Sequence, residues 1–369
     1  MNKPRSIGID CRMSSESGIG RYITNIVRNL AENDLTNTYT LYTYSDKDLS
    51  ELHLPENFHV VLAPFRWHTF SEQFNFLFLI LKGKHDLFHF PQTNYPIFYY
   101  RKFLITIHDL TMVKHMTGRA STLFYPFYYL KLLFFKLILK SGITFSSKII
   151  TVSEFVKKEL VSEFKVSNTK IKCIYNGVDL KLVYNPEKLD YFRDKYKIDK
   201  PFLFYVGNAY PHKNLEKLIM AFSLFNSENK YELVLVGKMD FFYERLIKEF
   251  KNLENIKFVF NVNDTELSKF YSSCEVFVYP SVSEGFGIQI VEALALKAKV
   301  CCSDNSTFPE IAGKLATYFN PYKIEEIVNA IKESLGASKK ITEAEIKEIR
   351  QKFNWKKSAQ LHQELYEES

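Results

Sequence analysis

The segment from Ser281 to Ala293 carries the clearest chemistry in the sequence. It places Glu284 in a glycine-containing turn after an apolar run, and Glu292 follows inside a helical pattern with seven residues between the two carboxylates. Free N–H groups and the positive dipole end of such a helix favour a phosphate. Carboxylates on either side of a phosphate site suit the hydroxyls of a sugar better than a metal ion. The alternative is a glycine-rich turn with two solvated glutamates.

A second segment, Val206 to Leu215, has the same order of strand, loop and helix and contains Lys213 close to the helix start. A cation is intrinsically disfavoured there, and an anionic ligand would explain it. A surface lysine with a buried stem is the alternative. Taken with the first segment, the pattern predicts two strand-to-helix phosphate sites in the C-terminal half of the chain.

The N-terminal half offers two weaker patterns. Gly18-Ile-Gly20-Arg21 follows the first predicted strand, but a dinucleotide fingerprint needs a third glycine where Ile23 stands, so an NAD-dependent dehydrogenase is disfavoured. His108 and Asp109 end an apolar strand, a place where parallel sheets bind ligands. A capping aspartate and a structural histidine are the alternative for that pair.

No convincing metal site or cofactor motif is found. Asp46 and Asp48 match the D-x-D of metal-dependent sugar transferases, but they lie in a charged run away from the other candidates and are interpreted as a solvated loop. H-E-x-x-H, P-loop and G-x-S-x-G motifs are absent from the sequence. We therefore expect no metal and no cofactor.

Short apolar runs alternate with helical patterns along the whole chain, which predicts an α/β protein with parallel sheets covered on both faces. After a polar stretch, 185–200, the alternation restarts at Pro201. We expect two Rossmann-like lobes that face a central cleft, one at 1–180 and one at 181–354. The boundary is expected between Asn176 and Lys200. The sequence leaves open whether the last helix, 355–369, joins the first lobe. The predicted strands are 6–11, 38–43, 59–63, 87–90, 103–107, 148–152, 170–174, 201–207, 231–236, 256–260, 276–279 and 299–302.

Composition sets the broad class. The 369 residues are 46% hydrophobic and 25% charged, as in ordinary globular proteins, and the net charge of +7 is mild, so no nucleic-acid partner is expected. The five cysteines are odd in number and lack a C-x-x-C, which favours a reducing compartment. No signal-peptide core and no apolar spanning stretch are present, and a cytoplasmic location is expected.

With these motifs in order, the chain resembles the retaining glycosyltransferases of family four, which have the GT-B fold. Glu284-Gly-Phe-Gly and Glu292 look like that family's signature of two glutamates with seven residues between them. The resemblance covers most of the chain through the motifs Gly18-Ile-Gly-Arg-Tyr22, His108-Asp109, Thr151-Val-Ser-Glu154, Asn176-Gly-Val-Asp179 and Lys213-Asn214.

The resemblance implies a role for each candidate. Glu292 would hold the ribose of a nucleotide-sugar and Glu284 the transferred sugar, while Lys213 and the backbone from Gly285 through Phe286 and Gly287 to Ile288 would hold the diphosphate. Gly20 would approach the phosphates, the base would lie near Val262, and His108, beside Asp109, would line the sugar pocket. The family usually has Arg near the lysine where His212 stands here, so either one cation is missing from the diphosphate site or Arg21 substitutes for it.

The resemblance also implies transfer with retention, without a metal, from a nucleotide-diphosphate sugar to a glycan or lipid-linked acceptor of surface-polysaccharide assembly. It favours GDP-mannose as donor and leaves UDP-hexoses open. A sugar-nucleotide epimerase of the same fold and a non-enzymatic two-lobed sugar-binding protein are the rival interpretations.

One stretch of the N-terminal half predicts contact with an anionic membrane. Residues 112–172 contain eleven Lys or Arg against three Glu, a net charge of +8, and enclose the aromatic and lysine-bearing run 123–140. Such a run suits an interfacial helix, and a second aromatic cluster, 74–81, could add to the same face. We expect peripheral binding at the inner face of the membrane; a core helix with lysines at its solvent edge is the alternative.

Overall fold

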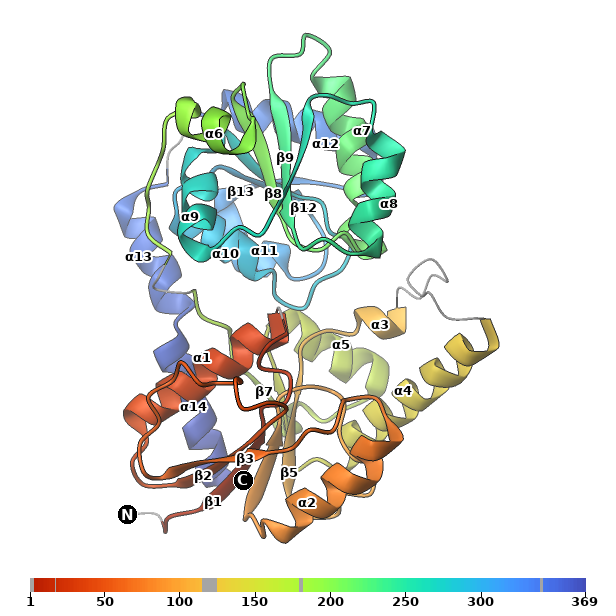
Figure 1. Cartoon of the computed structure of the whole chain (residues 1–369), viewed down its shortest axis with the longest axis vertical. Coiled ribbons are helices and arrows are strands. Elements are labelled where there is room, and N and C mark those ends of the chain that lie inside the picture. The colour runs from red at the N-terminus through yellow and green to blue at the C-terminus, as the bar shows by residue number, and fades with distance from the viewer. Residues whose placement is uncertain (1–2, 17, 115–124, 179–181, 339–340) are drawn as a thin grey trace. The chain divides into compact units, whose positions relative to one another are not determined.

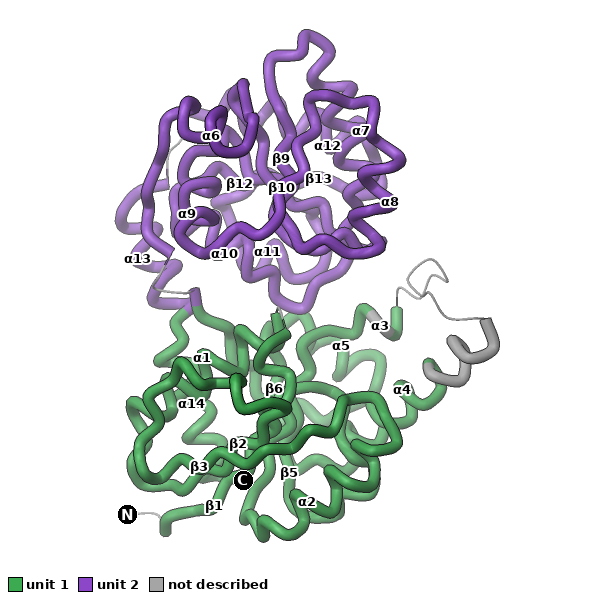
Figure 2. Tube along the Cα trace, viewed as in Figure 1, with its two compact units in different colours: residues 1–114, 121–177, 354–369 green, residues 115–120, 178–353 purple. Residues whose placement is uncertain are grey.

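The computed structural model describes residues 3–16, 18–114, 125–178, 182–338 and 341–369. They form two compact units (Figure 2). Unit 1 holds the described residues up to Gly177 together with 354–369, and unit 2 holds those from Val178 to Phe353. The boundary was predicted between Asn176 and Lys200, with the first lobe ending at residue 180, and the chain divides after Gly177.

Unit 1 is built on a seven-stranded parallel sheet (Figure 1). The inner strand β5 reads Phe-Leu-Ile-Thr-Ile and is buried at every residue, as a parallel sheet covered on both faces requires. In spatial order the strands are β3 (Phe58–Leu62), β2 (Thr38–Thr43), β1 (Ser6–Asp10), β4 (Leu87–Phe90), β5 (Phe103–Ile107), β6 (Lys148–Thr151) and β7 (Ile171–Cys173).

Helices cover both faces of this sheet. Helices α1 and α14 pack against each other, whereas α2, α4 and α5 contribute Ile80, Leu139 and Val156 to one buried apolar cluster with β4 and β5. Helix α5 begins where Ser153 Oγ accepts the N–H of Val156 and ends at Lys165 in the left-handed region. The bounds are α1 (Gly18–Asn33), α2 (Leu77–Lys82), α3 (Thr111–Lys114), α4 (Tyr125–Phe145), α5 (Glu154–Phe164) and α14 (Trp355–Glu368).

Unit 2 repeats the plan with six parallel strands. In spatial order they are β10 (Ile256–Phe260), β9 (Glu232–Gly237), β8 (Phe202–Val206), β11 (Val276–Tyr279), β12 (Val300–Ser303) and β13 (Ala316–Phe319). Helices α7, α8 and α12 cover one face, and α9, α10 and α11 the other (Figure 1). The bounds are α6 (Leu189–Tyr196), α7 (Leu215–Phe225), α8 (Phe241–Phe250), α9 (Asp264–Ser273), α10 (Ile288–Ala295), α11 (Phe308–Ala312), α12 (Ile324–Gly336) and α13 (Glu343–Lys352).

Two features depart from the sequence-based expectation. The polar stretch 185–200 contains helix α6, because Phe192 is buried against Phe202 and Phe270. The edge strand β13 is absent from the predicted strands. No helix in the described part of the chain combines the length and apolarity that a membrane crossing requires.

Candidate functional site

The candidate site of unit 2 lies where the strand order of its sheet reverses. Strands β8 and β11 are neighbours, and the chain leaves β8 toward α7 and β11 toward α10, which cover opposite faces (Figure 1). Open parallel sheets bind ligands beyond the carboxyl ends of their strands at this point. The loop after β8 carries Lys213, and the loop after β11 carries Glu284.

Lys213 and Glu284 form a buried ion pair. Nζ of Lys213 contacts Oε1 of Glu284, and the two side chains are only 8% and 16% exposed. The same Nζ donates to the hydroxyl of Tyr279 at 3.3 Å. Lys213 is therefore a buried cation between two strand ends, and the surface-lysine interpretation is wrong.

Oε1 of Glu284 accepts hydrogen bonds from several donors. Besides Lys213, the hydroxyls of Ser281 and Tyr279 donate to Oε1 at 2.7 and 3.0 Å. The backbone of Glu284 is fixed by Ser306, whose Oγ accepts from its N–H at 2.9 Å and donates to its C=O at 2.5 Å. Among the described residues Oε2 of Glu284 has no hydrogen-bond partner, so this oxygen is available to a ligand.

Electrostatics keep Glu284 ionised. Burial by itself would raise the pKa of this carboxyl, but Lys213, His212 and the Ser281 hydroxyl together hold the pKa below its ordinary value. His212, which stands where the family resemblance leads one to expect an arginine, also accepts the N–H of Val282 at 2.8 Å through its backbone oxygen. His212 therefore joins the two loops as well as adding to the local potential.

The start of α10 is shaped by glycine. Gly287 has φ +78°, in the left-handed region, and a Cβ there would lie 3.0 Å from the ring of Phe308, so a larger residue would be strained. Gly285 and Phe286 are buried just before it, and the Phe286 ring meets Phe353 edge to face at 5.6 Å. The helix itself begins at Ile288, which places its first free N–H groups next to Glu284.

Glu292 occupies the second turn of α10. It is 1% exposed, and the hydroxyl of Tyr271 in α9 donates to its Oε2 at 2.9 Å. Val262, which was predicted to lie near the base of a nucleotide-sugar, is half-buried in the loop between β10 and α9. In this loop Asn261 has left-handed backbone angles and Asn263 caps α9.

In unit 1, His108 and Asp109 follow β5, as expected, but they differ in environment. Nε2 of His108 lies 2.9 Å from the carbonyl oxygen of Pro91, and its ring meets Tyr22 edge to face at 4.8 Å. Burial lowers the pKa of His108, and the Pro91 carbonyl and Asp109 oppose that shift only in part. Asp109 is exposed and accepts the N–H of Thr111 at 2.8 Å, so it serves at least as a local cap.

Gly20 and Arg21 lie in the first turn of α1. A Cβ on Gly20 would come within 2.4 Å of the Ser14 carbonyl oxygen, so its absence lets the helix pack on the preceding loop. Gly18, in contrast, has open space around it. Arg21 is half-buried.

Sequence reasoning missed a buried charge network at the end of β1. The guanidinium of Arg12 binds both oxygens of Asp10 at 2.7–2.8 Å and Glu72 at 2.7 Å, and all three side chains are inaccessible to solvent. Arg12 also lies 3.5 Å from the centroid of the Phe76 ring. Asp10 and Glu72 are 62 positions apart, so only the fold reveals the network.

Within the described residues no group of three or more His, Cys, Asp or Glu side chains is arranged to hold a metal ion. Asp48 instead accepts the N–H groups of Tyr44 and Ser45, each at 2.9 Å, which is a turn-forming role. Asp46 is exposed in the same turn.

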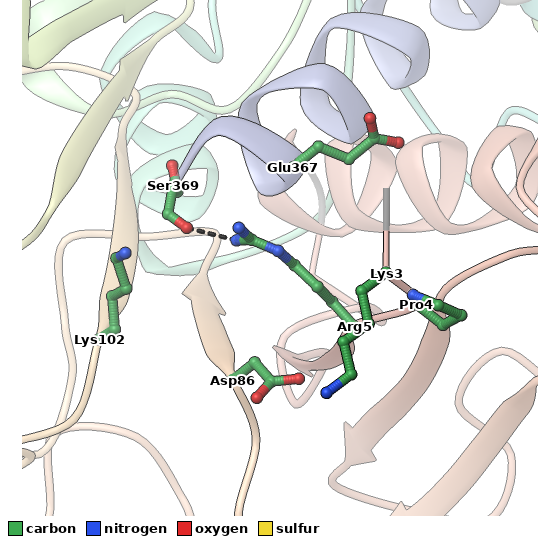
Figure 3. Close-up of a pocket in the computed structure, with 7 residues that line it drawn as sticks. All are labelled: Lys3, Pro4, Arg5, Asp86, Lys102, Glu367 and Ser369. Carbon is green, nitrogen blue, oxygen red and sulfur yellow. Dashed lines mark hydrogen bonds between the residues drawn. The ribbon is translucent and has the colours of Figure 1, made fainter. Parts of the chain in front are cut away.

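A pocket of about 440 Å³ lies in another part of unit 1 (Figure 3). Arg5, Asp86 and Lys102 line it, and each directly precedes a strand, so it belongs to the amino ends of β1, β4 and β5. Arg5 closes its floor by donating to the backbone oxygens of Tyr366, at 2.8 Å, and Ser369. The pocket therefore lies at the amino ends of the strands, opposite the carboxyl ends at which open parallel sheets bind ligands.

Two family models match this chain. Residues 17–182 match the Glycosyltransferase Family 4 model, and residues 190–352 match the Glycosyl transferases group 1 model. The chain belongs to glycosyltransferase family 4. This glycosyltransferase is 28% identical over 274 residues to the O-antigen chain mannosyltransferase RfbU of Salmonella typhimurium, covering 73% of this chain and 71% of RfbU.

A second relative is longer. The serotype-specific mannosyltransferase WbdA of Escherichia coli is 27% identical over 225 residues, which cover 58% of this chain but only 28% of WbdA. Among solved structures, Anabaena HepE in complex with UDP-glucose superposes with a TM-score of 0.77 over 99% of this chain and 100% of HepE, at 17% sequence identity. The two parallel α/β units and this likeness confirm the GT-B fold, and the epimerase and binding-protein alternatives are not favoured.

Proposed function

We propose that the protein transfers a hexose, mannose in the first instance, from a nucleotide-diphosphate sugar to a glycan or lipid-linked acceptor in surface-polysaccharide synthesis. The observation that carries the proposal is the buried pair of Lys213 and Glu284 at the strand-order reversal of unit 2. The names of RfbU and WbdA support mannose, and hence GDP-mannose as the donor. A UDP-hexose is the second candidate.

In this proposal the donor binds along the carboxyl ends of β8 and β11. Nζ of Lys213 and the N–H groups from Gly285 to Ile288, in the loop that leads into α10, neutralise the diphosphate. Oε2 of Glu284 accepts a hydroxyl of the transferred sugar, since Oε1 is already occupied. Glu292 accepts the ribose hydroxyls, and the base lies near Val262.

Unit 1 supplies the remaining proposed contacts. The residues proposed for these contacts lie at the end of β5 and at the start of α1. His108 contacts the sugar through Nδ1, since its Nε2 is hydrogen-bonded to the Pro91 carbonyl oxygen. Asp109 sits beside it with an exposed carboxylate. Gly20 and Arg21 are proposed for the phosphates, with Arg21 offsetting the missing arginine at position 212.

We further propose retention without a metal ion. The bond between the anomeric carbon and the diphosphate breaks, the acceptor oxygen bonds to that carbon on the same face, and the departing phosphate oxygen takes the acceptor's proton. Lys213 and the α10 N-terminus would carry the leaving charge that a metal carries elsewhere.

A surface of exposed aromatic side chains on unit 1 supports the proposal of a lipid-linked acceptor. The helical stretch through α2 exposes Phe70, Phe74 and Phe78 at 82%, 51% and 63%, four residues apart. The side chain of Gln73 connects this stretch to the loop between β4 and β5. It donates to the backbone oxygen of Tyr95 at 3.2 Å and accepts from the Ile97 N–H at 2.9 Å. That loop exposes two more aromatic rings, Phe98 and Tyr100.

Helix α4 packs on the same face of the sheet and alternates apolar and basic side chains on its exposed side. Leu133, Phe134 and Leu137 are about half exposed, and Lys136 and Lys140 are exposed beside them. Residues 115–124 of the basic stretch, and the side chain of Lys131, lie outside the described residues. Apolar rings flanked by ammonium groups suit the interface of an anionic membrane, so we propose peripheral binding at its cytoplasmic face.

A nucleotide panel tests the proposal. Thermal-shift measurements with GDP, UDP and ADP and their hexose derivatives should select one nucleotide, expected to be GDP. The selected donor is then incubated with and without lipid-linked glycan, and the products are followed by mass spectrometry. A glycan one hexose longer supports the transferase, whereas epimerised donor without acceptor, or no nucleotide binding at all, contradicts it.

A further inference from the structure

A chain of hydrogen bonds runs through the core of unit 1 and joins helix α14 to strands β4 and β5. Its members are Tyr366 and His362 of α14, His89 of β4, Thr106 of β5 and Tyr22 of α1, and none is more than 1% exposed. The chain starts at Tyr366, whose Oη lies 2.7 Å from Nδ1 of His89, and continues from Nε2 of His89 to Oγ1 of Thr106 at 2.8 Å. Oγ1 of Thr106 lies 3.1 Å from Oη of Tyr22, which in turn lies 2.6 Å from Nε2 of His362. The chain ends where Nδ1 of His362 meets the Ser358 carbonyl oxygen at 2.7 Å.

The Ser358 carbonyl sets the direction of every link. A carbonyl only accepts, so Nδ1 of His362 carries the hydrogen, and in the neutral ring Nε2 must accept from the Tyr22 hydroxyl. Tyr22 then accepts from Thr106, and Thr106 accepts from Nε2–H of His89. Nδ1 of His89 accepts from Tyr366. Each hydroxyl and ring N–H therefore donates once, provided that both histidines are neutral.

The electrostatic environment agrees with neutral rings. Burial lowers the pKa of His362 to about 4 and holds the pKa of His89 well below its ordinary value. The chain is thus fully satisfied near neutral pH, and the Tyr22 hydroxyl is held between Thr106 and His362. A buried tyrosine held at its hydroxyl has a fixed ring orientation.

The fixed ring of Tyr22 forms one wall of the His108 environment. The two rings meet at 4.8 Å with an interplanar angle of 88°. On its other side, Nε2–H of His108 donates to the Pro91 carbonyl oxygen at 2.9 Å. This leaves Nδ1 of His108 without a hydrogen-bond partner among the described residues and able to accept from a hydroxyl.

We propose that Tyr22 is a positioning residue for His108. Hydrogen bonds from the Tyr22 hydroxyl to His362 of α14 and Thr106 of β5 fix the orientation of the Tyr22 ring. The ring in turn holds His108 so that it keeps the proton on Nε2 and presents Nδ1 as an acceptor to a sugar hydroxyl. The destination of Nδ1 rests on the proposed function. The positioning itself does not, since it concerns only the ring and its tautomer.

Histidine NMR on the intact protein tests the positioning directly. The chain has nine histidines, and His108→Gln assigns the ring signals of His108 in ¹⁵N-histidine-labelled protein. The intact protein should show a single neutral Nε2–H tautomer for His108 at pH 7. Tyr22→Leu, which removes the ring, should give a mixture of both tautomers, and Tyr22→Phe, which removes only the clamp, a smaller change in the same direction.

A matched control removes another buried hydroxyl from the same unit. Tyr95 donates to or accepts from Ser141 at 2.7 Å and is fully buried, so Tyr95→Phe should leave the His108 signals unchanged. If Tyr22→Leu fails to fold, Tyr22→Phe and His362→Gln carry the same measurement. Unchanged His108 signals in every folded variant of Tyr22 and His362 would overturn the proposal.

Kinetics separate the positioning from the proposed function. With the nucleotide-sugar selected above, Tyr22→Phe should lower kcat several-fold and Tyr22→Leu at least tenfold, with the donor KM changed less than twofold. Altered His108 signals without any transfer activity in the intact protein would refute the proposed function and leave the positioning intact. Altered signals with unchanged kcat would remove the sugar contact of Nδ1.

Discussion

The hydroxyl of Tyr271 lies 2.9 Å from Oε2 of Glu292, and this hydrogen bond joins α9 to α10 inside unit 2. Both residues are buried, Glu292 at 1% and Tyr271 at 0% exposure. The burial and the hydrogen bond together fix the orientation of this carboxylate within unit 2.

Glu292→Ala should weaken binding of the selected nucleotide-sugar roughly 10- to 100-fold, because a hydrogen bond to a charged group is worth about 1.5–3 kcal/mol. Tyr271→Phe should weaken it less, since the carboxylate remains but loses one anchor. Titration calorimetry measures both variants, with the exposed Glu254→Ala as control. Wild-type affinity in Glu292→Ala would remove this residue from the site.

The Lys213–Glu284 pair should be more sensitive to single than to double substitution. Glu284→Ala leaves a buried ammonium without its carboxylate, and removal of one partner of a buried pair costs about 3 kcal/mol. The double variant Lys213→Met, Glu284→Ala should recover much of the unfolding free energy that the single variants lose, as measured in urea. Transfer should be lost in the double variant and in the single variants Lys213→Met and Glu284→Ala, chiefly through kcat for Glu284→Ala. A double variant as unstable as the sum of the singles contradicts the pairing.

Acid should destabilise unit 1 through His362. Its pKa falls from the ordinary value near 6.5 to about 4 on folding, so between these values the unfolded chain binds a proton that the folded protein does not. Stability should therefore be full above pH 6.5 and fall by up to about 1.4 kcal/mol per pH unit as the pH drops toward 4. Urea unfolding as a function of pH should show a shallower slope for His362→Gln than for the exposed control His53→Gln.

Transfer should survive removal of divalent cations. Lys213 and the start of α10 are proposed to carry the diphosphate charge, so excess EDTA should reduce the rate less than twofold. Asp46→Asn should likewise retain activity, because this side chain is exposed in a turn. Loss of transfer in EDTA that manganese restores would instead assign the metal role to Asp46 and Asp48.

Unit 1 should bind anionic vesicles at low salt. Lys136→Glu with Lys140→Glu should reduce co-sedimentation at least tenfold, because each basic group near such a surface contributes about 1 kcal/mol. Phe74→Ser with Phe78→Ser should also reduce it, whereas Leu224→Ser, on an equally exposed side chain of α7, should not. Equal recovery with neutral and anionic vesicles would refute the surface.

Most strands were predictable from runs of apolar residues. Strands β2, β4, β5, β10 and β11 match their predicted bounds, and the fully buried β12 begins one residue later than predicted. Strand β13 was not predicted, since it has only four residues and three of them are half-buried, so it gives no long apolar run.

For the candidate site, sequence placed Glu284 in a loop and Glu292 in the following helix, as the structure does. It could not pair Glu284 with Lys213, since 71 positions separate them and only the adjacency of β8 and β11 brings them together. Tyr279 and Tyr271 were missed for the same reason: in sequence they read as ordinary core aromatics, and their hydroxyl partners come from other elements.

The return of α14 to unit 1 has a consequence for biosynthesis. The described part of unit 2 is one continuous stretch of chain, so it can complete its sheet as soon as it leaves the ribosome. Unit 1 cannot, because His89 lacks Tyr366 and Tyr22 lacks His362 until residues 354–369 are made. Unit 1, although translated before unit 2, is therefore the last to reach its final structure, and until then the side of α1 that packs against α14 stays uncovered.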